Sequence, residues 1–172
     1  MKLRFFPTTI FRETPKVTFF DAGLDASNGC DVVIHSEEAI SPPDDFKDEQ
    51  YYVHNHQIDH NLVITGERTF VLINPAWNEP LHVIYLNRSM GALEIPIGTY
   101  LRSISGKEGS IVLNQPTRDK FFDPAKEFIP QKLDKVRLIK ARKTPPVYWV
   151  WGNDQIKRVL FNPLERKVKT LT

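Results

Sequence analysis

Three of the five histidines in this 172-residue chain lie within one short segment, at His54, His56 and His60. Side chains alternate between the two faces of a β-strand, so a strand through this segment places Tyr52, His54 and His56 on one face. If that face lines a barrel, the two imidazoles share one cavity. Such a pair can act as general acid and base near neutral pH, or can bind a transition metal.

Other polar residues are candidates to complete this site. Asp59 or Glu94 is expected to hold a histidine in one tautomer, with Glu94 lining the barrel opposite the pair. Tyr100 and Arg102 share a strand face by the same alternation. Tyr100 offers a phenolic proton donor, and Arg102 offers a bidentate contact to a carboxylate or phosphate. Packing of Tyr100 and a surface ion pair of Arg102 are the structural alternatives.

Short β-strands are the elements that must position these residues. The chain contains 13 Pro and 8 Gly, which interrupt it too often for a helical bundle. Turn residues are expected at 66–67 and 106–109, and one or two helical turns at 123–128. Apolar runs predict strands at 31–35, 51–56, 61–65, 69–74, 82–86, 92–95, 100–104, 110–114, 136–139, 147–151 and 156–161. This pattern is typical of a β-sandwich or barrel.

Composition and charge exclude several kinds of partner. A net charge of +2, from 23 Lys and Arg against 21 Asp and Glu, argues against nucleic acid. No apolar stretch reaches the roughly 20 residues that span a bilayer, so we expect no membrane partner. Residues 1–15 lack the continuous apolar segment of a signal peptide. Because Cys30 is the single cysteine, we expect no internal disulfide and a cytoplasmic location.

The histidine run, followed by a strand, a glycine turn and another strand, resembles the first motif of the cupin superfamily. The segment 91–101 resembles the second motif, with Leu101 at the position where many cupins have a histidine ligand. The glutamate of the first motif is absent unless Asp59 takes its place. In a shifted register, Tyr52 replaces the first histidine. Neither register completes a four-ligand metal site.

Within the cupins, residues 50–130 resemble the RmlC-like sugar branch. This branch includes the dTDP-sugar 3,4-ketoisomerases (WxcM-like) and the dTDP-4-dehydrorhamnose 3,5-epimerases. The resemblance rests on the histidine run, the strand 110–114, Arg118-Asp119 and the aromatic and acidic run 121–128. It implies an all-β fold, a single jelly-roll β-barrel in one domain over 1–172, with extra terminal strands at 1–35 and 136–161. It also implies a homodimer.

The same resemblance implies an isomerase or epimerase that acts on a nucleotide-linked keto sugar without a cofactor. The expected catalytic residues are His54, His56 and Tyr100, and the expected substrate-binding residues are Tyr52, Glu94 and Arg102. The ketoisomerases carry a Gly-rich, Arg-bearing segment before the histidines, where an arginine commonly binds phosphate. Residues 49–53 replace that segment here.

Two alternatives remain open from the sequence. The first is a metal-dependent cupin, an oxygenase or isomerase, with a divalent transition metal on His54, His56 and His60. Three histidines suffice for a catalytic metal when water takes the open position. The second is a non-catalytic cupin that binds a small ligand, which the incomplete motifs favour.

Overall fold

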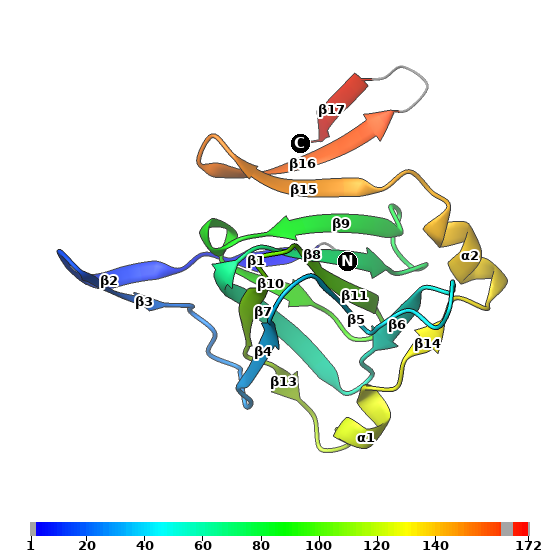
Figure 1. Ribbon diagram of the computed structural model, residues 1–172, viewed down its shortest axis with the longest axis horizontal. Coiled ribbons are helices and arrows are strands. Elements are labelled where there is room, and N and C mark those ends of the chain that lie inside the picture. Colours follow the sequence, from blue (N-terminus) through cyan, green and yellow to red (C-terminus); the bar gives the residue numbers. More distant parts are fainter. Residues whose placement is uncertain (1–2, 163–166, 172) are drawn as a thin grey trace.

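Two β-sheets face each other in the computed structural model, which describes residues 3–162 and 167–171 (Figure 1). The first sheet has the order β1-β10-β7-β12-β4, and the short β13 pairs with β7. Its strands are β1 (Arg4–Phe6), β4 (Asp31–His35), β7 (Gln57–Gly66), β10 (Ala92–Ile95), β12 (Ser110–Asn114) and β13 (Thr117–Arg118). All of these pairings are antiparallel.

The second sheet has the order β14-β6-β11-β8-β9-β15-β16-β17, and β5 pairs with β11. Its inner strands are β5 (Ala39–Ser41), β6 (Gln50–Val53), β8 (Arg68–Ile73), β9 (Leu81–Leu86), β11 (Tyr100–Ser105) and β14 (Gln131–Lys132). The strands β15 (Val147–Gly152), β16 (Gln155–Asn162) and β17 (Lys167–Leu171) extend it at the top of Figure 1. β15 joins β9 in parallel, so the C-terminal strands continue the sheet beyond the sandwich.

Apolar side chains from both sheets fill the space between them at one end. The first sheet contributes Val63, Leu93 and Val112, and the second contributes Leu72 and Ile84, all of them completely buried. Because successive strand residues point to opposite faces, each strand gives every second residue to this core. The prediction of an all-β fold is confirmed, and the strand pairings run in two sheets rather than around one closed barrel.

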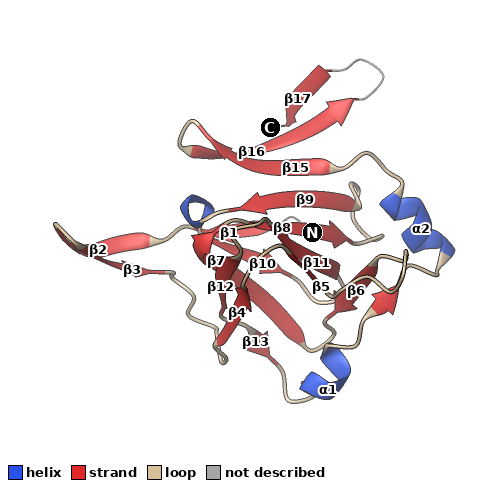
Figure 2. Ribbon diagram, in the orientation of Figure 1, coloured by secondary structure: helices blue, strands red, loops and turns tan. Residues whose placement is uncertain are grey.

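A hairpin, two short α-helices and the 3-10 helix η1 (Arg88–Met90) complete the chain (Figure 2). The strands β2 (Thr9–Thr14) and β3 (Val17–Asp21) form a separate two-stranded sheet that extends away from the rest of the molecule. The helix α1 (Pro124–Glu127) begins at the predicted cap, where the Asp123 side chain accepts a hydrogen bond from the Ala125 amide. No described helix is long and apolar enough to cross a membrane.

The predicted strand at 136–139 is wrong, because this segment begins the helix α2 (Val136–Arg142). Leu138 and Ala141 are buried three residues apart, a helical spacing, while Val136 and Ile139 are exposed. The buried pair packs on a cluster that includes Tyr51 of β6. Packing on this apolar cluster therefore stabilises a helix, although the segment contains β-branched residues.

Candidate active site

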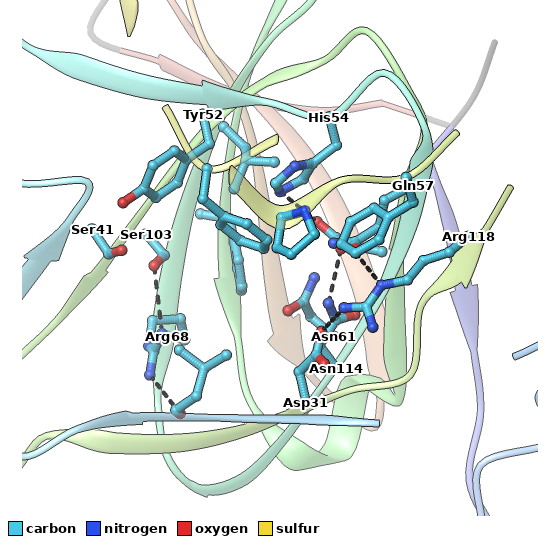
Figure 3. Close-up of a pocket in the computed structure, with 17 residues that line it drawn as sticks. Asp31, Ser41, Tyr52, His54, Gln57, Asn61, Arg68, Ser103, Asn114 and Arg118 are labelled. Carbon is cyan, nitrogen blue, oxygen red and sulfur yellow. Dashed lines mark hydrogen bonds and ion pairs between the residues drawn. The ribbon is translucent and has the colours of Figure 1, made fainter. Parts of the chain in front are cut away.

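A cavity of about 430 Å³ lies between the two sheets, and Phe70 and Leu101 of the apolar core form part of its lining (Figure 3). One wall comes from β4, β7, β12 and β13, and the other from β5, β6, β8 and β11. The segment 122–128 lies over it through Phe122, Pro124 and Phe128. The other lining residues are Asp31, Val33, Ser41, Tyr52, His54, Gln57, Asp59, Asn61, Arg68, Phe70, Leu101, Ser103, Asn114 and Arg118.

His54 lies in this cavity between two buried carboxylates. Its Nε2 atom is 3.6 Å from Oδ2 of Asp59, and its Nδ1 atom is 3.5 Å from Oε2 of Glu127. Both distances exceed a hydrogen bond of normal length, and the buried Nδ1 has no hydrogen-bond partner among the described residues. The ring packs on the edge of Phe128 and stacks loosely with Tyr52. The imidazole is therefore held in place by packing and charge, and neither of its nitrogen atoms makes a hydrogen bond of normal length.

Glu127 fixes the turn that carries His54. Its Oε2 atom accepts a hydrogen bond of 2.7 Å from the backbone amide of Asn55, although the two residues are 72 positions apart in sequence. The His54 carbonyl accepts from the Gly98 amide at 2.8 Å, which ties the same turn to the segment before β11. Two long-range contacts thus determine where the imidazole lies.

Asp59 faces His54 from β7. Its Oδ1 atom accepts hydrogen bonds from Gln57 Nε2 at 2.6 Å and from Asn114 Nδ2 at 2.8 Å. Burial raises the pKa of Asp59, and the nearby His54 and the two amide donors oppose this effect only in part. A carboxyl group with a raised pKa beside an imidazole is an arrangement that can exchange protons near neutral pH.

The cavity end of the first sheet is polar because every second residue of β7 points inward. Gln57, Asp59 and Asn61 are these inward residues, and Asn114 of β12 joins them. Arg118 extends the network, because its Nε donates to Gln57 Oε1 at 2.7 Å and its guanidinium also pairs with Asp31. Arg118 therefore pairs with Asp31 of β4 and not with Asp119, its neighbour in sequence.

The prediction that His54 and His56 share one strand face is also wrong. β6 ends at Val53 and β7 begins at Gln57, so both histidines lie in the connecting turn, where strand alternation does not apply. The His56 side chain is 39% exposed and its Nδ1 lies 3.0 Å from Oδ2 of Asp119, outside the cavity lining. The two imidazoles therefore do not form an acid/base pair in one cavity.

His60 and Glu94 lie on the opposite face of the first sheet. They are register partners on β7 and β10, and Oε2 of Glu94 lies 3.3 Å from Nε2 of His60. Because Asp59 and Asn61 point into the cavity, His60 between them points away from it. Glu94 also pairs with Arg4. The expectation that Glu94 lines the cavity opposite the histidines is therefore wrong.

The residues of the metal alternative do not converge. His54 lies in the cavity, His56 in the exposed turn and His60 on the far face of β7. Among residues 3–162 and 167–171, no group of three His, Cys, Asp or Glu side chains is arranged to hold a metal ion. The side chains of this cavity do not fit a metal centre.

Tyr52 lines the cavity as expected, whereas Tyr100 and Arg102 do not. Leu101 points inward, so its two neighbours on β11 point to the outer face of the second sheet. There Tyr100 packs against the cluster under α2. Arg102 is buried and its Nη2 lies 3.0 Å from Oδ1 of Asp44. Their roles are structural, as the alternatives for these residues stated.

Several cavity residues escaped the sequence analysis. Gln57 and Asn61 were detectable, because they alternate along one strand with Asp59, which the sequence analysis named. Arg68 was not detectable, since an arginine after a turn is normally exposed, yet it is 1% exposed here. Glu127 reaches the site through a fold-dependent contact that no local pattern signals.

Comparisons with known proteins agree with this architecture. No family model and no curated protein matches the chain. Among solved structures, QdtA of Thermoanaerobacterium thermosaccharolyticum, a sugar 3,4-ketoisomerase in complex with TDP, matches with a TM-score of 0.54 and 12% identity over 83% of this chain and 94% of its own. A 3,4-ketoisomerase of Helicobacter canadensis matches with a TM-score of 0.55 and 11% identity over 83% and 99%. ChmJ of Streptomyces bikiniensis, a 3'-monoepimerase in complex with dTDP-quinovose, matches with a TM-score of 0.54 and 8% identity over 75% and 68%.

The chain has the RmlC-like cupin fold. The fold implied by the sequence resemblance is thereby confirmed, although the identities are low. Within this RmlC-like cupin fold, the cavity between the sheets holds one histidine rather than the expected pair. The two carboxylates that flank it, Asp59 and Glu127, distinguish the site from a simple polar opening.

Proposed function

We propose that this chain is an isomerase or epimerase that acts on a nucleotide-linked keto sugar by acid/base catalysis at His54, without a metal. The observation that supports this proposal is the imidazole between Asp59 and Glu127 at the wall of the cavity. General acid/base catalysis requires a group that titrates near working pH within reach of the substrate, and imidazole meets that requirement. The cavity volume lies in the range of roughly 300–1,000 Å³ typical of small-molecule sites.

The reaction begins with proton transfer from carbon to nitrogen. A proton on the carbon next to the sugar's keto group passes to His54, and the C–H electron pair moves toward the carbonyl oxygen to form an enolate. The imidazolium that results lies beside the carboxylates of Asp59 and Glu127, which stabilise its positive charge. Phe122 and Phe128 over the cavity limit access of water to this intermediate.

A second proton transfer completes the reaction. Tyr52 is the tyrosine that lines the cavity, and its ring lies 6.4 Å from that of His54. Its phenol can donate a proton to the enolate from a different direction than His54. Return of a proton to the opposite face of the same carbon gives epimerisation. Return of a proton to the former carbonyl carbon, together with passage of the neighbouring hydroxyl proton to the former carbonyl oxygen, gives ketoisomerisation. We therefore assign the second role, expected for His56 or Tyr100, to Tyr52.

The solved neighbours guide the choice of substrate. QdtA has been solved with TDP and, as a variant, with TDP-4-keto-6-deoxyglucose. ChmJ has been solved with dTDP-quinovose. The second and third of these ligands are nucleotide-linked deoxy sugars, so dTDP-4-keto-6-deoxyglucose is the first compound to test on this chain. The cavity can enclose the sugar, and the nucleotide would remain outside it.

Deuterium exchange tests this proposal directly. The chain is incubated with dTDP-4-keto-6-deoxyglucose in heavy water, and NMR follows deuterium at the ring carbon next to the ketone. His54→Asn should slow exchange by about 10²-fold or more, the usual contribution of a general base, and Tyr52→Phe should slow product formation. His56→Asn is the matched control, because His56 lies two residues away and outside the cavity. Absence of exchange in the wild-type protein, or equal exchange in His54→Asn, would contradict the proposal.

We also propose that the protein is a homodimer in which the β2–β3 hairpin packs on a second copy. Isolated two-stranded sheets are marginally stable in water. Ile10 and Phe11 of β2 are 56% and 68% exposed, and Val17 and Phe19 of β3 are also exposed. Light scattering coupled to size exclusion should give twice the chain mass for the wild-type protein and the monomer mass for Ile10→Ser/Phe11→Ser. A monomeric wild-type protein would contradict this assembly.

A further inference from the structure

A buried arginine in the cavity wall has no negatively charged partner. Arg68 opens β8 and lies across the cavity from His54 in Figure 3. Its side chain is 1% exposed. Within the described part of the chain it makes no ion pair, and its nitrogen atoms contact only neutral acceptors. These are the Ser110 hydroxyl and carbonyl, the Ser103 hydroxyl, the His35 ring and the Val33 carbonyl. A buried charge without a counter-charge is strongly unfavourable.

The other charged groups of the cavity have partners. Arg118 pairs with Asp31, and Asp59 faces His54. In the described residues, Arg68 is thus the charged group of the cavity lining that lacks a counter-charge. An anionic group on a bound ligand would supply it.

The terminal nitrogen atoms of Arg68 have capacity for such a group. The Nε atom donates a firm hydrogen bond of 2.7 Å to the Ser110 hydroxyl, which fixes the guanidinium plane. Nη1 lies 3.2 Å from Nε2 of His35 and 3.4 Å from the Ser103 hydroxyl. Nη2 lies 3.2 Å from the Ser110 carbonyl and 3.4 Å from the Val33 carbonyl. These contacts are at or beyond the long end of normal hydrogen bonds, so an anion would compete with them readily.

His35 cannot supply the missing negative charge and is itself neutral. Burial and the adjacent Arg68 lower the pKa of His35 to about 4. Its Nδ1 lies 2.9 Å from the Ser105 hydroxyl, and that hydroxyl donates to the Glu37 carbonyl. His35 therefore carries its proton on Nδ1 and accepts from Arg68 at Nε2. This chain of hydrogen bonds orients Arg68 without neutralising it.

Two serine hydroxyls complete the arrangement. Ser103 and Ser41 are register partners on β11 and β5, and both line the cavity beside Arg68 (Figure 3). The Ser103 hydroxyl accepts from Arg68, but no described residue accepts its own proton. The Ser41 hydroxyl makes no hydrogen bond to a described side chain or carbonyl. One guanidinium and two hydroxyl donors thus converge on the same part of the cavity.

We propose that Arg68, Ser103 and Ser41 form a subsite for a carboxylate on the sugar, so that the substrate is a nucleotide-linked keto sugar acid. This inference rests on the proposed function and adds the substrate class. A planar carboxylate matches the terminal nitrogen atoms of a guanidinium. A phosphate dianion fits less well, because Asp31 and Asp59 line the same cavity and repel it. The cavity of about 430 Å³ leaves the nucleotide phosphates outside this subsite.

Equilibrium binding of a matched ligand pair tests the subsite. UDP-glucuronate and UDP-glucose differ only in a carboxylate in place of a hydroxymethyl group, and neither carries the ketone needed for turnover. NMR titration of the wild-type chain should show UDP-glucuronate binding about tenfold tighter or more, the range expected for hydrogen bonds to a charged group. Arg68→Met should bring the two affinities together by weakening the binding of UDP-glucuronate. Ser41→Ala/Ser103→Ala should reduce the preference and keeps the test available if Arg68→Met does not fold.

Each outcome decides the inference. Equal affinities in the wild-type chain, or an unchanged preference in the folded variants, would overturn it. Inorganic phosphate that competes with UDP-glucuronate as strongly as glucuronate itself would assign the subsite to phosphate and also overturn it. The His54→Asn variant separates this inference from the proposed function, because binding needs no turnover. A preserved preference without deuterium exchange in the wild-type protein would leave the subsite standing and reject the isomerase.

Discussion

Asp59→Asn separates the chemical role of the buried carboxylate from its structural role. In the wild-type protein Oδ1 of Asp59 accepts from Gln57 and Asn114, while Oδ2 faces His54 Nε2 at 3.6 Å. Asparagine has nearly the same shape, and its Oδ1 retains both amide contacts. Its Nδ2 replaces the oxygen that faces the imidazole. The substitution therefore removes the negative charge beside His54 and offers Nε2 a donor instead of an acceptor.

The expected effects on activity and stability have opposite signs. Loss of the charge that stabilises the imidazolium should slow proton exchange by about 10²–10⁴-fold, the range of general acid/base catalysis, which is about 3–5 kcal/mol of barrier. For stability, two charge-assisted hydrogen bonds become neutral ones, a loss of about 1 kcal/mol each. Removal of the buried charge also removes its desolvation cost, which raises the free energy of unfolding by several kcal/mol. We expect the variant to be more stable at neutral pH by about 1–2 kcal/mol.

The pH dependence supplies the sign test. Burial raises the pKa of Asp59 in the folded state above its value in the unfolded chain. The folded protein therefore binds this proton more tightly, and the stability from this group is full below the ordinary aspartate pKa. That stability is lost as pH rises through the folded pKa. The variant has no such group, so its advantage in free energy of unfolding should grow from acid toward neutral pH.

Urea unfolding across pH and the deuterium exchange assay together check this prediction. Asn61→Ala serves as the control, because it changes the same wall of the cavity without adding or removing a charge. Asn61 lines the same wall without contacting His54. An Asp59→Asn protein that exchanges at the wild-type rate would refute the catalytic reasoning. A stability advantage that shrinks toward neutral pH would refute the sign assigned to the pKa of Asp59.

Two further predictions concern the fold. Burial lowers the pKa values of His35 and His82 to about 4. As pH falls from about 6.5 to about 4, the unfolded chain therefore takes up protons that the folded chain does not, and urea unfolding should show a loss of stability over this window. His35→Gln and His82→Gln should each reduce this loss, and an unchanged pH dependence in both variants would contradict burial as its cause. Gly109→Ala should lower the free energy of unfolding by several kcal/mol, and Gly98→Ala by about 1–2 kcal/mol. Both glycines have a positive φ, but a Cβ at Gly109 would lie 2.2 Å from the His35 carbonyl oxygen, whereas a Cβ at Gly98 would meet no atom within 4 Å. Equal losses in urea unfolding would show that the contact with the His35 carbonyl adds nothing to the cost.

Most strands were predictable because their apolar patterns and the turn residues between them are local features of the sequence. β7 and β8 are joined at the predicted turn around Gly66 but belong to different sheets, whereas β15 and β16, both predicted as strands, pair with each other. Most pairings in the two sheets join strands distant in sequence, such as β7 with β12, and no local pattern predicts them. The helix α2 was missed because its buried spacing has meaning only over the cluster that contains Tyr51. Local β-propensity cannot report a surface formed by distant residues.

The site was predicted only in part because its face depends on strand ends and register. The reasoning from His54 to His56 assumed a strand through both, but β6 ends at Val53. One residue of difference moves a side chain to the other face. Strand alternation also explains why Tyr100 lies outside the cavity. The resemblance put Leu101 at the position of a metal ligand, which faces inward, so its neighbour Tyr100 faces outward. Consistent use of that register would have removed Tyr100 and Arg102 from the site.

The two walls of the cavity differ in a way that suits the proposed sugar substrate. The wall from the first sheet presents amide and carboxyl groups at Gln57, Asp59, Asn61 and Asn114, which match ring hydroxyls. The wall from the second sheet presents Tyr52, Phe70 and Leu101, which match the C–H face of a pyranose. A sugar between them places one edge toward the polar network and one face against apolar rings. His54 lies in the turn between β6 of the second sheet and β7 of the first, so it stands where the two walls are joined. We therefore expect the imidazole to face ring C–H bonds of the bound sugar as well as its hydroxyls.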